Sequence, residues 1–348
     1  MSTSPEIARL AEPPPRSRGG GRGSGKKRRG GKRVDEHQMV PDATFTSYYG
    51  RPILKASPWE KDIPAYLFLG GLAAGSSILG AGADLSGRPV LRKSARVTSL
   101  TAISLSMVAL VHDLGRPERF LHMFRVAKPS SPMSVGTWIL TAYGPLAGLA
   151  GAAELLPGFV RQTALGRLLL WGARPAGLLA AVVAPAVASY TAVLLSDTAT
   201  PTWHDAHEHL PFVFVGSAAA ASGGLGLVLA PLGESSPARR MAVGGAVLEL
   251  AVLRRMEAAM GLTAEPLHLG TPGKLMRASH HLTVVGAIGA AVSGRSRLLS
   301  ALSGAALVAG SACTRFGIFE AGQHSAMDPK YVVIPQRERL AARKAAGL

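Results

Sequence analysis

Long apolar runs alternate with short charged or proline-rich connections along most of this 348-residue chain. The clearest run, Ile63–Ala83, has no charged residue and about the 20 residues that an α-helix needs to cross the hydrocarbon core of a membrane. Two later runs, Met241–Leu253 and Ala278–Val292, must be extended or tilted to span. The pattern predicts an all-α integral membrane protein, a bundle of about eight transmembrane helices. The candidate spans are Ile63–Ala83, Arg96–Val111, Met133–Leu156, Pro175–Leu195, Leu210–Leu229, Met241–Leu253, Ala278–Val292 and Leu298–Thr314.

Small residues within the runs predict close contacts between helices. The first span contains Gly71-x-x-x-Gly75, and Leu210–Leu229 contains SAAAASGGLGLVLA. Glycine, alanine and serine let helix backbones approach closely in a membrane. We therefore expect these two faces to be packed against other helices.

The same pattern divides the chain into four parts. We expect a disordered basic arm at 1–45, an interfacial segment at 46–62, a multi-helix transmembrane domain at 63–314 and a polar C-terminal tail at 315–348. The arm has too few apolar residues to build a core. Tyr48, Tyr49 and Trp59 suit the headgroup zone of a bilayer.

Composition and charge agree with a membrane protein. The chain is 47% hydrophobic, and its formal net charge is +17, which in a soluble protein would suggest nucleic acid. However, nine of the 38 Lys and Arg residues lie between Arg16 and Arg33, so the charge is partly a property of the arm. The arm could meet anionic lipid, nucleic acid or an acidic partner, or stay solvated. For the chain as a whole we expect the lipid bilayer, and not nucleic acid, as a partner.

Loop charges leave the membrane orientation open. The loops after the first, third, fifth and seventh spans are rich in arginine, which favours the cytoplasm for them and the outside for both termini. The basic arm favours the cytoplasm for the N-terminus instead.

The stretch His112–Thr137 concentrates ionisable residues between two apolar runs. On a helix end, His112 and Arg116 are i,i+4 neighbours and Asp113 pairs with Arg116 at i,i+3. Asp113 would then stay ionised, His112 could donate protons, and Glu118 could continue the path to water. The alternative is a capping and surface network, with Gly115 at the helix C-terminus and arginines on lipid phosphates.

Other candidates have simpler explanations. Tyr190 and Asp197 are seven residues apart and share one helical face, although a buried tyrosine often bonds only a backbone carbonyl. The histidines between His204 and His209 do not have a metal-site spacing, so we predict a solvated or partner-facing loop and no metal. For Glu249 we favour an ion pair with Arg254 or Arg255 over a proton path. The single cysteine, Cys313, excludes cysteine-based zinc and iron–sulfur sites.

Three segments carry a family resemblance: IPAYLFLGGLAAGSSILGAGADLSGRP, DLGRPERFLHMFRVAKPSSPMSVGTWIL and SYTAVLLSDTATPTWHDAHEHLPFVF. Together they resemble the NrfD/PsrC family, the membrane subunit of polysulfide reductase-like and formate dehydrogenase-like molybdoenzyme complexes. DLGRPERF and SPMSVGTW are the specific blocks. The resemblance implies an eight-helix, haem-free quinone-handling anchor in the bacterial inner membrane. It also implies two partners, a ferredoxin-like iron–sulfur subunit and a molybdopterin oxidoreductase subunit. Iron–sulfur clusters and molybdopterin would be bound only by these partners.

The resemblance also implies where quinone would bind. In the family, menaquinone or ubiquinone is held among the first four helices near the electron-delivering partner. The matching polar positions here are Glu60, Tyr66, Tyr190 and the cluster of His112, Asp113, Arg116 and Glu118. We expect the cluster to perform the redox-linked proton chemistry, and Glu60, Tyr66 and Tyr190 to bind the quinone.

Two other functions remain open on the sequence. Glycine-rich helices and carboxylates near the membrane midplane also occur in secondary transporters, although the two halves of this chain show no convincing repeat. A membrane scaffold without a redox role is the third possibility. Because the anchor never meets the substrate of the catalytic partner, the sequence leaves that substrate open.

Overall fold

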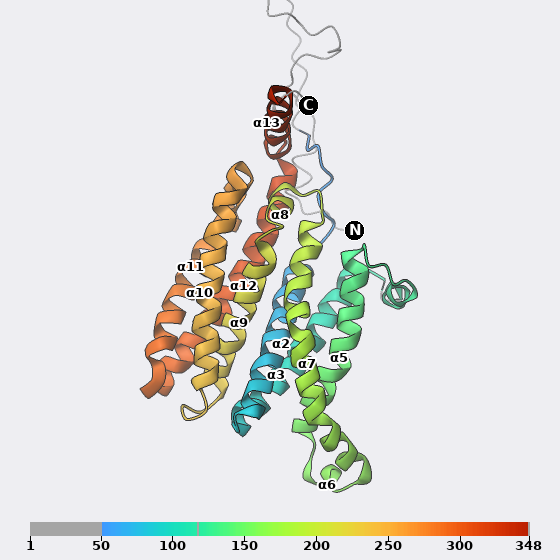
Figure 1. The fold of residues 1–348 in the computed structure, drawn as a ribbon, viewed down its shortest axis with the longest axis vertical. Coiled ribbons are helices and arrows are strands. Elements are labelled where there is room, and N and C mark those ends of the chain that lie inside the picture. Colours follow the sequence, from blue (N-terminus) through green and yellow to red (C-terminus); the bar gives the residue numbers. More distant parts are fainter. Residues whose placement is uncertain (1–50, 117, 347–348) are drawn as a thin grey trace, which may run out of the picture. The chain divides into compact units, whose positions relative to one another are not determined.

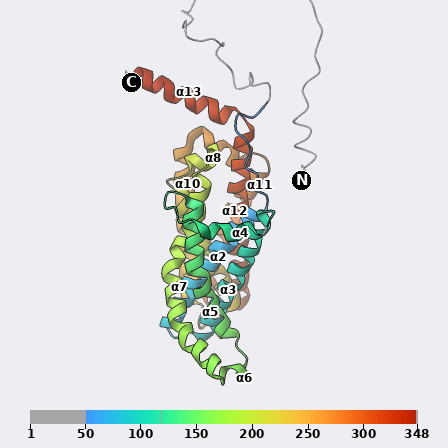
Figure 2. The same cartoon turned by 90° about the vertical axis from the view of Figure 1, so that its right-hand side faces the viewer.

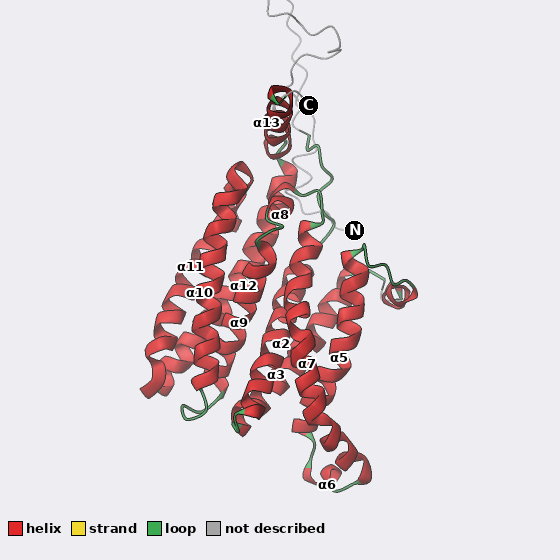
Figure 3. Ribbon diagram, in the orientation of Figure 1, coloured by secondary structure: helices red, strands yellow, loops and turns green. Residues whose placement is uncertain are grey.

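The computed structural model describes residues 51–116 and 118–346, and every regular element in them is a helix (Figure 3). This confirms the all-α fold predicted from the sequence. The predicted disordered arm, residues 1–45, lies outside the described residues. The chain forms one compact unit over Leu54–Ala326, and a second unit contains the C-terminal residues from Met327 on, with helix α13 (Lys330–Ala345).

Eight helices in the described part have 20 or more residues, in agreement with the predicted count of spans (Figure 1). Five of them, α2, α3, α7, α9 and α12, are long and apolar enough to cross a membrane. The other three are as long but lack a stretch that is apolar enough to be counted with these five. The eight are α2 (Asp62–Leu85), α3 (Pro89–Asp113), α5 (Pro132–Leu155), α7 (Ala164–Ser196), α9 (Leu210–Leu229), α10 (Ser236–Met260), α11 (Gly270–Val292) and α12 (Arg297–Met327).

Several helices extend beyond the predicted limits, among them α3, α10 and α11, and α7 and α12 show why charge and proline misplace an end. Helix α7 starts at Ala164 and contains Pro175, although that proline was predicted to begin the span. Helix α12 continues past Thr314 to Met327 because the next residue, Arg315, is buried and bonded instead of facing water. Charged residues and prolines usually mark a helix end because water can bond the free backbone groups there. A membrane interior excludes water, so a helix inside it continues past such a residue.

Short helices occupy the connections. They are α4 (Arg119–His122), η2 (Met123–Arg125), α6 (Gly158–Arg161), α8 (Pro201–Asp205), η3 (Gly261–Leu267) and η4 (Ser293–Arg295). Within the unit Leu54–Ala326, the long helices run side by side in two perpendicular views (Figures 1 and 2). We call the end with residues 112–131 and 197–209 the site end, and the end with residues 86–88 and 156–163 the arginine end.

Helix α2 is the most enclosed of the five apolar helices, and its glycine face is packed as predicted. A β-carbon at Gly75 would lie 2.3 Å from Ser222 Oγ and 2.8 Å from the carbonyl oxygen of Ala218, both on α9. At Gly71 it would lie 3.2 Å from the guanidinium of Arg315 on α12. The two glycines therefore set how closely α2 approaches its neighbours.

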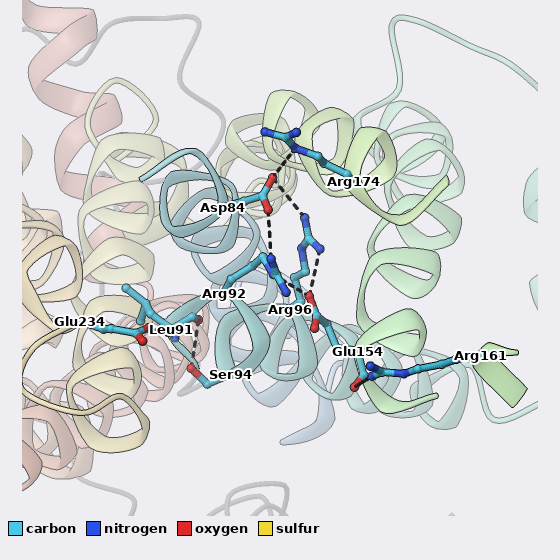
Figure 4. Close-up of polar contacts among 9 residues, drawn as sticks. All are labelled: Asp84, Leu91, Arg92, Ser94, Arg96, Glu154, Arg161, Arg174 and Glu234. Carbon is cyan, nitrogen blue, oxygen red and sulfur yellow. Dashed lines mark hydrogen bonds and ion pairs between the residues drawn. The ribbon is translucent and has the colours of Figure 1, made fainter. Parts of the chain in front are cut away.

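Buried charges join four helices at the arginine end (Figure 4). Asp84 accepts from Arg174 at 3.0 Å and from Arg92 at 3.4 Å. Glu154 accepts from Arg92 at 2.9 Å and from Arg96 at 3.0 Å. These contacts link α2, α3, α5 and α7. Because Arg96 and both carboxylates are largely buried, the network is harder to screen or to break than a surface ion pair.

We predict that Gly75→Ala destabilises the protein, because the added methyl group must displace Ser222 or the backbone of Ala218. Overpacking of this kind costs about 1–3 kcal/mol. Gly82→Ala on the same helix is the matched control, since nothing lies within 4 Å of its β-carbon position. Thermal unfolding in detergent should show a lower midpoint for Gly75→Ala only. Equal midpoints would mean that the α2–α9 contact is not tight.

We also predict that Arg96→Met lowers stability, by up to about 3–5 kcal/mol, because it removes one partner from a buried ion network. Lys93→Met removes a charge from an exposed position of the same helix and serves as the control. The midpoint of chemical denaturation in detergent measures both. A network that adds nothing to stability would leave the two variants alike.

Candidate functional site

Helix α3 ends at Asp113, three residues before Arg116, which was expected to lie on the same helical face as His112. Gly115 adopts a left-handed conformation with φ +65°, and its N–H donates to the carbonyl of His112 at 3.1 Å. Gly115 therefore caps the C-terminus of α3, as the alternative interpretation of the sequence predicted. The turn takes Arg116 out of the helical register, so the predicted pairing of Asp113 with Arg116 is wrong.

His112 and Asp113 instead contact the start of helix α2. His112 Nδ1 lies 2.7 Å from Asp62 Oδ2, and the backbone N–H of Glu60 donates to Asp113 Oδ1 at 3.5 Å. The side chain of His112 is 78% exposed and that of Asp62 is 35% exposed. The site end therefore presents an imidazole–carboxylate pair at the surface, with Asp62 at the first position of α2.

Tyr66 and Tyr190, which lie 124 residues apart, meet inside the bundle. Their hydroxyl groups form a hydrogen bond between α2 and α7, and both side chains are buried. The carbonyl of Tyr66 also accepts from Ser106 Oγ of α3 at 3.2 Å. Asp62 and Tyr66 are i,i+4 on α2 and so lie on one face, which places the tyrosine pair one turn inside the His112–Asp62 contact.

Tyr190 also lines an open groove of about 360 Å³ at the site end. Asp197 lines the same groove, which confirms that the two residues share a face of α7. Apolar side chains form much of the wall and hydroxyl groups form part of it. The lining residues are Pro129, Ser130, Pro132, Val135, Ile139, Ala186, Ser189, Tyr190, Val193 and Asp197. We call this cavity the Tyr190 groove.

Gly136 of the SPMSVGTW block positions Tyr190. A β-carbon there would lie 2.5 Å from Cε2 and 2.7 Å from Cδ2 of the Tyr190 ring. Only glycine leaves room for α5 to pack directly on the ring. The sequence analysis did not assign this role, although the glycine stands in a block that it singled out.

A second cavity, of about 270 Å³, lies between α3, α5 and the short helices α4 and η2. Phe120, Phe124 and Met107 are among its lining residues, and Thr137 and Thr141 are the only ones with polar side chains. The block DLGRPERFLHMF thus covers an apolar space and brings no charged side chain into it.

The remaining predicted site residues lie apart from the tyrosine pair. Arg116 and Glu118 are exposed, and in the described part of the chain neither makes a recorded side-chain contact with His112, Asp113, Tyr66 or Tyr190. The site end therefore separates into two sets. Glu60, Asp62, His112 and Asp113 meet at the surface, and Tyr66 and Tyr190 meet inside. Asp62 was missed, because only the packing of α3 against α2 brings it to His112.

The rings of His204 and His207 near α8 stack on each other, and His207 Nδ1 lies 2.9 Å from the carbonyl oxygen of His204. His204 Nδ1 lies 3.2 Å from the carbonyl of Ser196, and Asp205 accepts from Thr263 Oγ1 at 2.8 Å. Within residues 51–116 and 118–346, no three His, Cys, Asp or Glu side chains form a group that could hold a metal ion.

Glu249 does not pair with Arg254 or Arg255, which are exposed. Its Oε1 instead accepts from Thr314 Oγ1 at 2.6 Å, and Arg315 is the nearby positive charge that acts on it. The expected pairing on one helix is wrong because Glu249 faces the bundle interior, whereas the two arginines face outward.

A comparison with known protein families identifies the family of this chain. The family model described as "Polysulphide reductase, NrfD" matches residues 54–263, which include α2 to α10 and every predicted site residue. A comparison with curated proteins finds no match to this chain. Since the matched residues are well over half of the chain and its helices are long and apolar, the protein is a membrane protein that belongs to the NrfD family.

Proposed function

We propose that this chain is the quinone-reactive membrane subunit of a molybdoenzyme-type oxidoreductase complex. It passes electrons between an iron–sulfur partner subunit and the quinone pool. The observation that carries the proposal is the Tyr66–Tyr190 hydrogen bond, because Tyr190 also lines the Tyr190 groove. The proposal places a proton donor at the edge of a cavity that a quinone ring can enter.

The groove suits a quinone headgroup in size and in chemistry. Small-molecule sites are mostly apolar cavities of about 300–1,000 Å³ with a few polar groups that orient the ligand. Val135, Ile139 and Val193 offer apolar contact to a flat ring. The hydroxyl group of Ser130 could donate to a quinone carbonyl, whereas that of Ser189 already donates to the carbonyl of Pro185 at 2.9 Å.

Reduction of a quinone to a quinol adds two electrons and two protons. In the proposed route, protons enter at exposed His112 and pass to Asp62, then to Tyr66 one turn along α2, and finally to Tyr190. The same route runs in reverse for quinol oxidation. Asp113 and the backbone of Glu60 hold the start of α2 against the end of α3, which keeps His112 and Asp62 in contact.

The electrons would come from, or go to, clusters in the partner subunit. Cysteine thiolates normally hold iron–sulfur clusters, and this chain has one cysteine, Cys313. A molybdopterin subunit beyond that partner would carry the substrate chemistry. In the proposed complex the chain binds quinone and supplies protons at the membrane.

Tyr190→Phe tests the tyrosine pair. It keeps the ring that packs on Gly136 but removes the hydroxyl, so we expect quinone-linked turnover of the assembled complex to fall by about 100-fold, the lower range for loss of a general acid–base group. Tyr143→Phe is the control, because Tyr143 is also buried but bonds Ser77 and Ser99 instead. Activity with a soluble electron acceptor should stay unchanged in both. Normal quinone-linked turnover in Tyr190→Phe would contradict the proposal.

His112→Ala tests the proton entry. We expect slower quinone-linked turnover that added imidazole restores, because the small base replaces the lost side chain. His122→Ala, an exposed histidine on α4, should have no effect. A defect that imidazole does not restore would assign His112 a structural role.

Binding of a quinone analogue to the assembled complex separates the function classes. Tight binding that Tyr190→Phe weakens supports the proposal. Absence of any binding would favour a scaffold, and uptake of a substrate into vesicles by the isolated chain would favour a transporter.

A further inference from the structure

A second buried polar cluster lies among α9, α10, α11 and α12, away from α3, α5 and α7. Glu249 of α10 and Arg315 of α12 are each 1% exposed. Hydroxyl groups surround them: Thr314 bonds Glu249 at 2.6 Å and Ser279 at 2.6 Å. Ser217 bonds Ser311 at 2.8 Å and also acts on the Glu249 carboxylate as a hydrogen-bonding group. The quinone proposal uses none of these residues, and Arg315 lies outside the part matched by the family model.

The two charges are close but do not meet. Arg315 donates through Nη2 to the carbonyl of Phe214 at 2.6 Å, and its guanidinium carbon lies 3.6 Å from the centre of the Phe214 ring. In the described part of the chain, no ion pair within 4.0 Å joins Arg315 to Glu249, although Arg315 acts on Glu249 electrostatically. The nitrogen atoms of Arg315 and the carboxylate oxygens of Glu249 are therefore more than 4.0 Å apart in a buried site.

Atoms of both residues lack a hydrogen-bond partner. They are Glu249 Oε2, which can accept, and Arg315 Nε and Nη1, which can donate. Thr283 Oγ1 of α11, one turn beyond Ser279, is also buried without a partner. Buried polar groups in proteins nearly always have a partner, either protein or ordered water.

We propose that this cluster is a binding site for internal water between Glu249 and Arg315. Water fits both sides, because it accepts from the arginine N–H groups and donates to the carboxylate. A cation would be repelled by Arg315, and an anion by Glu249. In this proposal, water bridges the Glu249 carboxylate and the Arg315 guanidinium inside the part of the bundle formed by α9 to α12. This site is separate from the Tyr190 groove.

Radiolytic hydroxyl-radical footprinting of the full chain in lipid nanodiscs tests the site, because bound water generates radicals where it sits. Phe214 is fully buried but lies against Arg315, so we expect its oxidation to be several times faster than that of Phe319. Phe319 is the matched control, since it is also buried but packs on the ring of Trp203. Equal, slow oxidation of the two phenylalanines would overturn the proposal.

Two variants test whether a water molecule bound by Glu249 and Arg315 causes the fast oxidation of Phe214. Glu249→Gln keeps an acceptor for water and should keep the fast oxidation of Phe214. The double variant Glu249→Leu with Arg315→Met removes both polar partners, so oxidation of Phe214 should fall to the rate of Phe319. Fast oxidation that persists in the double variant would mean that bulk solvent, not a bound water, reaches Phe214. The wild-type comparison decides the proposal even if the double variant does not fold.

Discussion

The structure depends on one constraint, which is that a polar group in the hydrocarbon region has no water to bond and must find its partner inside the protein. Helices satisfy this for the backbone, and the eight long helices fill the described membrane unit. Side chains must satisfy it by packing. Small residues such as Gly75 bring the helices close enough for serine, tyrosine and arginine side chains to reach partners on the next helix.

That constraint gathers the polar groups of α2, α3, α5 and α7 into separate clusters. At the site end Tyr66 bonds Tyr190, whereas further along the same helices Ser77, Ser99 and Tyr143 bond one another. Between the clusters, α2 and α3 contribute buried Ala73, Ala102 and Ile103. Among the described residues, no hydrogen bond between two side chains joins the two clusters across this apolar layer. The proposed proton route therefore reaches quinone from the site end.

The arginine end has a different balance of charge. Arg92, Arg96 and Arg174 share two carboxylates, Asp84 and Glu154, so three positive groups meet two negative ones in a largely buried network. Such a network fixes four helix ends relative to one another. The site end instead presents exposed groups such as His112, to which the proposal assigns the exchange of protons with solvent.

Sequence patterns predicted the helical elements well, because span length and small-residue spacing are local properties of the chain. The number of long helices and the packed glycine face of α2 followed from them directly. The specific blocks also predicted the family, which the match of the family model over residues 54–263 confirms. Helix limits were less certain, since a buried arginine such as Arg315 looks like a boundary until its partners are known.

The pairing of side chains was decided by tertiary structure alone. Sequence spacing paired Asp113 with Arg116, and Glu249 with Arg254 or Arg255. The folded protein instead turns the chain at Gly115 and faces Glu249 toward α12. Tyr66 and Tyr190 were both predicted as candidates, yet only the packing of α2 against α7 makes them a hydrogen-bonded pair. The sequence by itself determined that the chain forms long helices rich in apolar residues, and roughly where along the chain each one lies. Which residues meet depended on helix packing, because the partners are far apart along the chain and no local pattern encodes the distance between them.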